Sequence, residues 1–495
     1  MVVGDIETGT EVAVVGAGPA GYVAAIRAGQ LGLDVTLVEK DAWGGTCLNY
    51  GCIPSKALIT AADLAHEAGD AEHMGIHADP AVDLSATVDW KDGVVDRLTG
   101  GVEKLCKANG VELVEGRAEF ADDSRLRVVH GGDGQGAETL VFEHAVVATG
   151  SRPIEIPGFD FNDGPVLDSR QALALESVPD RLVVVGAGYI GMELSTAFAK
   201  LGSDVTVVEM LEDVLPGYED DVARVVRERA REVGVDFRFG YTAAGWESTE
   251  DGIRVTADPA EEVAADGGTA VDADPDIDTD ADAEPIALAA DKTMVAVGRQ
   301  PVTDTLNLEA AGVETDDRGF VETDHRTTTS VDGIHAVGDV AGEPMLAHAG
   351  SAEGQVAAEV IAGEPAALDH QAVPAAVFTD PEVGTVGLTA AEAREEGFEP
   401  AVGEFPFRSS GRALTTDEDG GFVRIVADED TGFVLGGQVV GPEASELIAE
   451  VGLAVEMGAT LEDLASTVHT HPTLSEAVME AAEHAVGEAI HTLNR

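Results

Sequence analysis

The chain has 495 residues, of which 93 are acidic and 29 are basic, so its formal net charge is −64. A surface this negative repels phosphate backbones and anionic lipids, which argues against a nucleic-acid-binding or membrane-associated protein. Three cysteines are too few for a disulfide-stapled secreted scaffold, and 44% apolar residues can build several hydrophobic cores.

The composition also predicts where the protein works. The first residues are polar and acidic, unlike a signal peptide, and no apolar stretch is long enough to span a membrane, so we expect a cytoplasmic protein. Repulsion among the acidic side chains opposes compaction in dilute buffer and is screened by concentrated salt. We therefore expect a cytoplasm that accumulates salt. The alternative, an acidic disordered chain, conflicts with the apolar content.

A strand, a glycine-rich turn, a helix and a second strand are expected between residues 12 and 39. The strands cover 12–15 and 35–38, and the helix runs from Tyr22 to about Leu31. The chemistry-bearing positions are Gly16, Gly18, Gly21 and, after the second strand, Glu39. The first glycine makes a tight turn, the second lets a pyrophosphate approach the backbone, and the third lets helix and strand pack closely. With the helix N-terminus for phosphate and the acid for ribose, this spacing predicts a dinucleotide site.

Two cysteines, Cys47 and Cys52, follow this motif. Residues five apart in a regular helix rise about 7.5 Å, whereas the Cα atoms of a disulfide lie within about 4.4–6.8 Å. The segment must therefore be distorted, and Asn49 and Gly51 tolerate unusual backbone angles. A helix over about 54–67 should follow. A thiol pair beside a nucleotide cofactor suggests electron transfer through a disulfide, with two idle reduced cysteines as the alternative.

The strand–turn–helix–strand pattern recurs 170 residues later, with strands over 182–185 and 205–208. Its matching positions are Gly186, Gly188, Gly191 and Glu209, and Ile190 lies in the same turn. Two such motifs imply two dinucleotides. The first lies nearest the cysteines and should bind a flavin, because flavins accept electrons from thiols and pass hydride to nicotinamide. The second should bind NAD rather than NADP, because Glu209 repels a 2′-phosphate and residues 210–213 contain no arginine.

Residues from about 258 to 285 interrupt this second pattern. Between 272 and 282 an acid occupies every other position, without lysine or arginine. An EF-hand would need glycine at the sixth position, where Ile277 stands when counting starts at Asp272. We expect a solvated or disordered loop and no metal site.

In their order along the chain, these features resemble the flavin- and NAD-dependent disulfide oxidoreductases, and within them the dihydrolipoamide dehydrogenase group. Further segments that match this family are 115–118, 148–153, 296–301, 334–339, 345–348 and 378–382. The residues that the resemblance places at the cofactors are Ala118, Gly150, Asp339 and Ala347 for FAD and Gly298 for NAD.

The resemblance implies an α/β fold with two doubly wound Rossmann-like nucleotide-binding domains and a C-terminal α+β dimerisation domain. The expected domains are an FAD domain over 1–150, an NAD domain over 151–298 with the acidic segment, a central domain over 299–371 completing the FAD site, and a dimerisation domain over 372–495. Antiparallel strands around 433–440 should precede two helices.

The resemblance also assigns roles to four residues near the flavin. Cys47 becomes the sulfur that exchanges with substrate, and Cys52 the thiolate that lies against the flavin. Lys56 is placed near the flavin N5 and paired with Glu193, where a positive charge favours reduced flavin.

Thiol chemistry needs a base, because the attacking species is a thiolate. An imidazole held by a carboxylate suits this role, and the resemblance identifies such a dyad in His471 and Glu476. The neighbouring His469 is expected to be structural. The family pattern places the dyad in the partner subunit's active site, which implies a homodimer.

The resemblance implies oxidation of protein-bound dihydrolipoamide to lipoamide with NAD⁺ as acceptor, as in the shared component of 2-oxoacid dehydrogenase-type complexes. The expected partner is a lipoyl-bearing acyltransferase or another lipoyl protein. An NADH-dependent reductase of another low-molecular-weight disulfide would share nearly every motif and remains the alternative. A subunit that mainly organises an acyltransferase complex and a transhydrogenase working without thiols are disfavoured by the cysteine pair.

Overall fold

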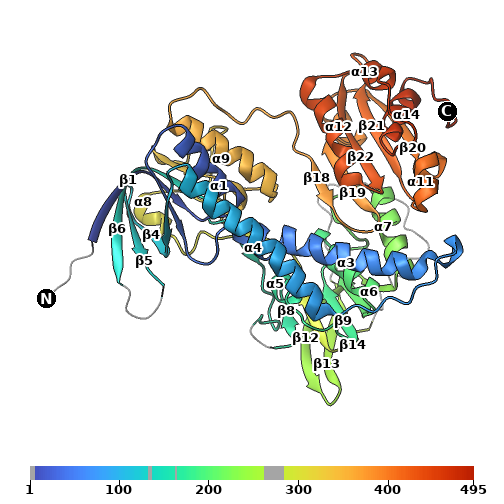
Figure 1. Ribbon diagram of the computed structural model, residues 1–495, viewed down its shortest axis with the longest axis horizontal. Coiled ribbons are helices and arrows are strands. Elements are labelled where there is room, and N and C mark those ends of the chain that lie inside the picture. Colours follow the sequence, from blue (N-terminus) through green and yellow to red (C-terminus); the bar gives the residue numbers. More distant parts are fainter. Residues whose placement is uncertain (1–5, 132–135, 162–163, 261–283, 495) are drawn as a thin grey trace.

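The computed structural model describes residues 6–131, 136–161, 164–260 and 284–494. Two largely parallel sheets and one antiparallel sheet, each with its own helices, lie in separate regions of the molecule (Figure 1). The expected α/β fold class is confirmed. No helix in the described ranges is both long and apolar enough to cross a membrane.

The first sheet carries the first glycine-rich turn. Its strands, in spatial order, are β3 (Glu112–Glu115), β2 (Val35–Glu39), β1 (Ile6–Val15), β6 (Ala137–Val147), β5 (Arg125–Val129) and β4 (Arg117–Asp122), and β17 (Ile334–Ala336) also pairs with β6. β4 and β5 form an antiparallel extension of an otherwise parallel sheet. Because β17 belongs to the chain after residue 298, that part of the chain returns to the first sheet.

Helix α1 (Pro19–Gln30) follows the turn and packs against α9 (Ala347–Ile361). A Cβ on Gly354 would lie 2.3 Å from the carbonyl oxygen of Ala20, so the two backbones approach too closely for any side chain there. Helix α1 begins three residues before the expected Tyr22, because Gly18 is its N-cap and proline suits the first helical turn.

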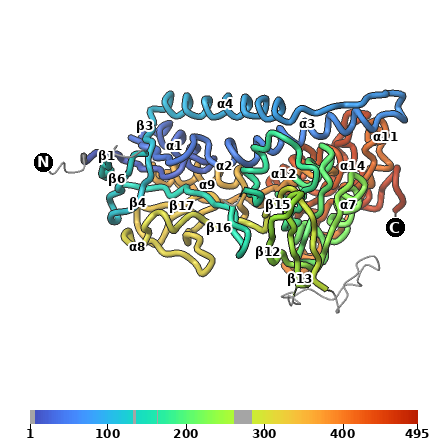
Figure 2. Tube along the Cα trace, turned by 90° about the horizontal axis from the view of Figure 1, so that it is seen from below, coloured from blue at the N-terminus to red at the C-terminus, as the bar shows by residue number. Residues whose placement is uncertain are grey.

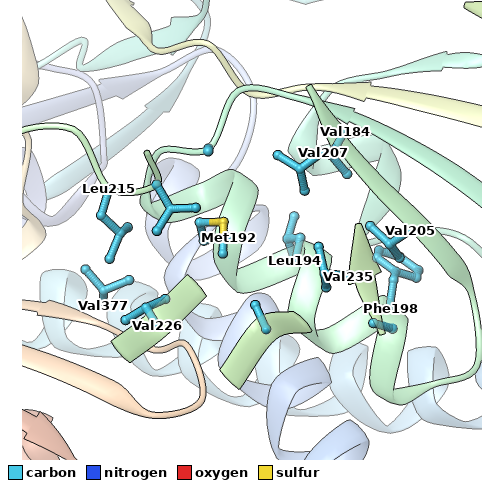
Figure 3. Packing of buried hydrophobic residues seen from close by; sticks show 14 of the residues in the cluster. Val184, Met192, Leu194, Phe198, Val205, Val207, Leu215, Val226, Val235 and Val377 are labelled. Carbon is cyan, nitrogen blue, oxygen red and sulfur yellow. The ribbon is translucent and has the colours of Figure 1, made fainter. Parts of the chain in front are cut away.

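The second sheet repeats this arrangement around the second glycine-rich turn. Its parallel strands are β11 (Val235–Phe239), β10 (Asp204–Glu209), β9 (Arg181–Val185), β15 (Lys292–Val295) and β8 (Val166–Leu167). Its helices include α5 (Ser169–Ala172), α6 (Tyr189–Lys200) and α7 (Asp220–Glu232). The core between α6 and the sheet contains Val184, Met192, Leu194, Phe198, Val205 and Val207 (Figure 3).

A three-stranded antiparallel sheet packs beside the second parallel sheet. Its strands are β12 (Tyr241–Thr249), β13 (Gly252–Pro259) and β14 (Ile286–Ala290). Ala257 of β13 pairs with Ile286 of β14, so the ends of the acidic segment lie side by side. Residues 261–283, on which the loop prediction mainly falls, lie outside the described residues.

A short antiparallel ribbon connects the two nucleotide-binding regions. β7 (Ser151–Pro153) pairs with β16 (Arg299–Pro301). The boundaries expected near residues 150 and 298 both fall at this ribbon, where the chain enters and leaves the second region. The division into four domains stays a prediction.

The C-terminal region is an antiparallel sheet covered by helices. Its strands are β18 (Ala375–Val377), β19 (Glu382–Gly387), β22 (Val434–Gly441), β21 (Phe422–Asp428) and β20 (Pro400–Pro406). Three helices rather than the expected two follow the last strand: α12 (Ala444–Met457), the short α13 (Leu461–Ser466) and α14 (Glu476–Ala485). Two long helices of the N-terminal region, α3 (Cys52–Asp70) and α4 (Leu84–Ala108), run side by side along one flank of the molecule (Figure 2).

Candidate active site

A cavity connects the first glycine-rich turn with the cysteine pair and helix α6. The predicted site residues that line it are Gly16, Gly18, Glu39, Cys47, Cys52, Lys56, Gly150, Ile190, Glu193, Asp339 and Ala347. Ligands of open parallel sheets bind at the carboxyl ends of the strands, and β1 and β6 both end at this cavity. Among the predicted FAD residues, Gly21 packs behind the turn and Ala118 is buried in β4, so these two do not line it.

The glycines of both turns meet the steric demands of a dinucleotide. A Cβ on Gly16 would lie 2.3 Å from a carbonyl oxygen of Ala148, and both first glycines have a φ of +102°. A Cβ on the third glycine would lie 1.9 Å or 2.0 Å from the carbonyl oxygen of the first. A Cβ on Gly18 or Gly188, by contrast, would meet nothing within 4 Å. Each turn therefore leaves open space at the helix N-terminus, where a pyrophosphate fits.

The acid after each second strand braces its own turn. Glu39 accepts a hydrogen bond from the Ala17 amide at 2.7 Å, and Glu209 accepts one from the Ala187 amide at 2.6 Å. The other oxygen of each carboxylate accepts hydrogen bonds from amides just after the acid. This bracing was not part of the sequence prediction. Since a carboxylate oxygen can accept more than one hydrogen bond, a ribose hydroxyl can still bind there.

The cysteine pair lies where a helix is broken. Cys47 belongs to α2 (Gly45–Asn49), Cys52 opens α3, and Tyr50 and Gly51 separate the two helices, as the predicted distortion requires. Both thiols are free, and each has the largest influence on the pKa of the other. The Cys47 side chain, with the Lys56 charge and the Cys52 amide, outweighs burial and lowers the pKa of Cys52 to about 7. The Cys52 side chain and burial raise the pKa of Cys47.

Lys56 and Glu193 form the expected pair across two regions. Lys56 Nζ lies 2.7 Å from Glu193 Oε2, and the Glu193 side chain is only 4% exposed. The other Glu193 oxygen accepts a hydrogen bond from the Phe378 amide at 2.9 Å, and Lys56 Nζ lies 4.3 Å from the centre of the Phe378 ring. These contacts fix the lysine beside Cys52 from α3, α6 and the C-terminal region together.

Asp339 is tied to the ribbon between the nucleotide-binding regions. Ser151 Oγ donates a hydrogen bond to Asp339 Oδ2 at 2.5 Å and accepts one from Arg299 Nε at 2.7 Å. Gly298, with a φ of +123°, precedes Arg299, and its carbonyl oxygen accepts a hydrogen bond from the amide of Ile154. Gly298 does not line the cavity described above.

His471 and Glu476 form the predicted dyad but lie away from the cysteines of their own chain. His471 Nδ1 is 2.9 Å from Glu476 Oε1, and the histidine side chain is 79% exposed. Hydrogen bonds from the Thr473 amide and from His471 outweigh burial and lower the pKa of Glu476. Neither dyad residue lines the cavity. The nearby His469 side chain is 7% exposed, and its Nε2 lies 2.8 Å from Glu450 Oε1, so it is held within the C-terminal region.

The sequence analysis did not single out four residues of the site. Ser151, Tyr189 and Arg299 line the cavity, and Phe378 holds Glu193 in place. Tyr189, in the second glycine-rich turn, lines the cavity, and burial raises its pKa to about 12. The contacts of Arg299 with Ser151 and of Phe378 with Glu193 span 148 and 185 residues. No local spacing signals such contacts.

A dithiol between two dinucleotide-binding turns can move an electron pair between thiols and a pyridine nucleotide. Fold and site together define a disulfide oxidoreductase of the flavin-dependent class. Residues 10–354 match the family model described as pyridine nucleotide-disulphide oxidoreductase, and residues 373–482 match its dimerisation domain. The chain belongs to the pyridine nucleotide-disulphide oxidoreductase family, and it is an oxidoreductase that uses FAD and NAD.

Similar proteins agree with this assignment. A dihydrolipoyl dehydrogenase of Halobacterium salinarum is 70% identical over 100% of both chains, and one of Haloferax volcanii is 67% identical over 100% of both. The crystal structure of LpdA from Mycobacterium tuberculosis is 29% identical, with a TM-score of 0.85 over 96% of this chain and 99% of that chain.

Proposed function

We propose that the protein oxidises dihydrolipoyl groups carried by a partner protein and passes the electrons to NAD⁺. The observation that carries this proposal is the pair of Cys47 and Cys52 in the cavity that runs from the first glycine-rich turn to the first residues of helix α6. The two similar haloarchaeal proteins are named dihydrolipoyl dehydrogenase. A lipoyl-bearing acyltransferase is the natural partner for this activity, and the cytoplasm the natural location.

In the oxidised enzyme, Cys47 and Cys52 form a disulfide. His471 of the partner subunit takes a proton from a substrate thiol, and the resulting thiolate attacks the Cys47 sulfur, which breaks the Cys47–Cys52 bond and leaves Cys52 as a thiolate. The second substrate thiol then attacks the substrate sulfur bound to Cys47, which closes the substrate disulfide and, with the proton of that thiol, leaves Cys47 as a thiol. Bound FAD supplies the two-electron connection to nicotinamide. Overall, two substrate thiols become a disulfide, NAD⁺ becomes NADH, and one proton is released.

The residues of the site support these roles. Lys56 stabilises the Cys52 thiolate, and Glu193 holds the lysine in place. Glu476 holds the His471 imidazole through Nδ1, which leaves Nε2 to take the proton.

A homodimer would bring the dyad to the cysteines. The C-terminal region exposes large apolar side chains, which are Phe433, Leu453, Met457, Val468, Ile490 and Leu493. Val468 is 93% exposed and stands three residues before His471. Apolar surface of this kind is typical of a subunit interface. Changing Leu453 to Glu should therefore shift a dimer towards monomer in sedimentation analysis, whereas changing Leu105 to Glu on α4 should not.

The proposed reaction is tested by NADH formation from dihydrolipoamide and NAD⁺. Cys47→Ser and Cys52→Ser should each abolish this turnover, while Cys106→Ala, at a buried cysteine outside the cavity, should retain it. All variants should still oxidise NADH with ferricyanide, which does not need the thiols. Undiminished dihydrolipoamide oxidation by Cys52→Ser would contradict the proposal.

A reductase of another disulfide is separated from this activity by substrate preference. The value of kcat/KM for dihydrolipoamide with NAD⁺ should exceed that for low-molecular-weight disulfides with NADH. A reversed preference would favour the reductase.

A further inference from the structure

The four residues between the redox cysteines are held mainly by short-range contacts. The Asn49 side-chain amide donates to the carbonyl oxygens of Trp43 and Gly45 at 3.0 and 2.9 Å, and the Tyr50 amide donates to Thr46. Tyr50 ends helix α2 and lines the cavity. Its ring contacts the second nucleotide-binding region.

Arg170 of helix α5 makes that contact. Its guanidinium carbon lies 3.4 Å from the centre of the Tyr50 ring, which is a close stack. Arg170 Nη1 also lies 3.2 Å from Asp41 Oδ2, and burial together with the nearby Asp41 charge raises the pKa of the Tyr50 phenol. Arg170 of α5 thus contacts both Tyr50, in the loop of residues 48–51 (the redox loop), and Asp41, just after β2.

Helix α5 is a fixed support for this arginine. Asp168 and Gln171 form a capping box, and the Gln171 side chain also donates to the carbonyl oxygen of Phe161 at 2.8 Å. Ala172 and Leu173 are buried against the second sheet. The guanidinium is therefore presented from a helix that is anchored within the second nucleotide-binding region.

The stack, rather than the ion pair, carries the interaction. Arg170 and Asp41 are both about half exposed, and such surface pairs contribute little and are screened by salt. A cation above an aromatic face corresponds to a roughly two- to fivefold effect at an exposed site. Because dispersion and ring contact persist in concentrated salt, this contact suits a highly acidic protein.

We infer that Arg170 is a positioning residue for the redox reaction: by stacking on Tyr50 it holds the loop between α2 and α3, and so the relative position of the Cys47 and Cys52 thiols. The inference rests on the proposed redox role of the pair. Arg170 touches neither sulfur, and it acts only through Tyr50 and the backbone of the loop.

The groups that face Cys52 determine in which direction loss of the stack should shift the pKa of this thiol. Cys47 and Lys56 favour the Cys52 thiolate, whereas Glu193 opposes it, and the Tyr189 phenol also faces Cys52. A loosened loop lets the Cys47 side chain, which has the largest of these influences, move away from Cys52. Releasing the stack should therefore disfavour the thiolate.

The test measures thiolate formation without using turnover. The reduced holoenzyme is treated with iodoacetamide across a range of pH, and alkylation of the tryptic peptide 41–56, which carries both redox cysteines, is followed by mass spectrometry. Arg170→Ala should lower its alkylation rate near neutral pH about two- to fivefold and move the pH midpoint upward. Arg170→Lys, which keeps the cation but not the planar face, should recover part of the loss.

Two further variants make the result specific. Tyr50→Leu should reproduce the effect of Arg170→Ala, and the double variant should add nothing beyond either single change. The control is Arg254→Ala, which removes an equally exposed arginine paired with Glu247 on the β12–β13 hairpin. An unchanged midpoint in Arg170→Ala, or an equal shift in Arg254→Ala, overturns the inference. Undiminished turnover by Cys52→Ser would instead overturn the proposed function.

Discussion

The electrostatic role of Lys56 can be separated from its structural role by changing it to Met. Lys56 is the charged group that favours the Cys52 thiolate, whose pKa is about 7. An opposite charge at close range shifts a pKa by about 1–3 units. Removing the cation therefore raises the pKa of Cys52 by at least about one unit, to roughly 8. At pH 7 the thiolate fraction then falls from about one half to about one tenth, a roughly fivefold loss.

The same change also leaves Glu193 as a buried carboxylate without its cation. Breaking one side of a buried pair costs about 3–5 kcal/mol, whereas neutralising both partners costs much less. Lys56→Met should therefore destabilise the fold, and the double variant Lys56→Met/Glu193→Gln should recover most of that stability. Because Glu193 raises the pKa of Cys52, the double variant should have a pKa between those of Lys56→Met and the unchanged protein.

Two measurements separate the effect of Lys56 on stability from its effect on the Cys52 thiolate, in the unchanged protein, Lys56→Met, the double variant and Lys107→Met. Thermal unfolding gives stability, and the pH midpoint of alkylation of the reduced cysteine pair gives thiolate formation. Lys107→Met is the control, since Lys107 pairs with Glu103 on the exposed face of α4. If the double variant regains stability and its midpoint also returns to that of the unchanged protein, the Lys56 charge does not set the thiolate pKa, and the reasoning fails.

Four further outcomes are expected. Gly16→Ala should destabilise the protein by about 2 kcal/mol or more, because Gly16 has a positive φ and an added Cβ would collide with a carbonyl oxygen. Gly18→Ala should fold normally but retain less FAD, because an added Cβ enters the open space at the helix N-terminus. Equal FAD content and equal melting temperature in the two variants would argue against the assigned roles. His471→Gln should lower dihydrolipoamide turnover at least about a hundredfold while NADH–ferricyanide activity persists, as general-base losses of this size predict; loss of both activities would indicate misfolding. The melting temperature should rise with KCl between about 0.1 M and about 3 M through charge screening, and a flat response would exclude salt adaptation. Deleting residues 261–283 should leave NADH formation intact, because the adjoining strands already pair at their ends; loss of turnover would assign the segment a role.

The sequence was a sufficient guide wherever the chemistry is local. The two glycine-rich turns match their predictions because strand, turn, helix and acid lie within about thirty residues, and backbone sterics fix their shape. The break between Cys47 and Cys52 followed from helix geometry alone. Only the helix ends differed, since α3 starts at Cys52 rather than near Pro54. That earlier start places the Cys52 thiol at a helix N-terminus, which favours its thiolate.

Contacts between regions could not be predicted in the same way. The Phe378 amide reaches Glu193 only because the C-terminal region docks beside α6, and Arg170 meets Tyr50 only because α5 lies over the cavity. Side-chain spacing along the chain carries no information about such docking. The dyad of His471 and Glu476 is a related case: its internal geometry is local and was predictable, whereas its proposed meeting with the cysteines requires a second copy of the chain.

The distribution of cations shows how an acidic protein can keep its site electrostatics constant. Only seven lysines are present in the chain, and two of them form ion pairs between regions in which one partner is buried. Lys56 pairs with Glu193 beside the thiols, and Lys200, 4% exposed, lies 2.7 Å from Asp63 and 2.8 Å from Asp380. Pairs removed from solvent are screened far less than surface charges. Salt can therefore relieve repulsion over the surface while the charge that sets the Cys52 thiolate changes little, so stability and thiol reactivity respond separately to ionic strength.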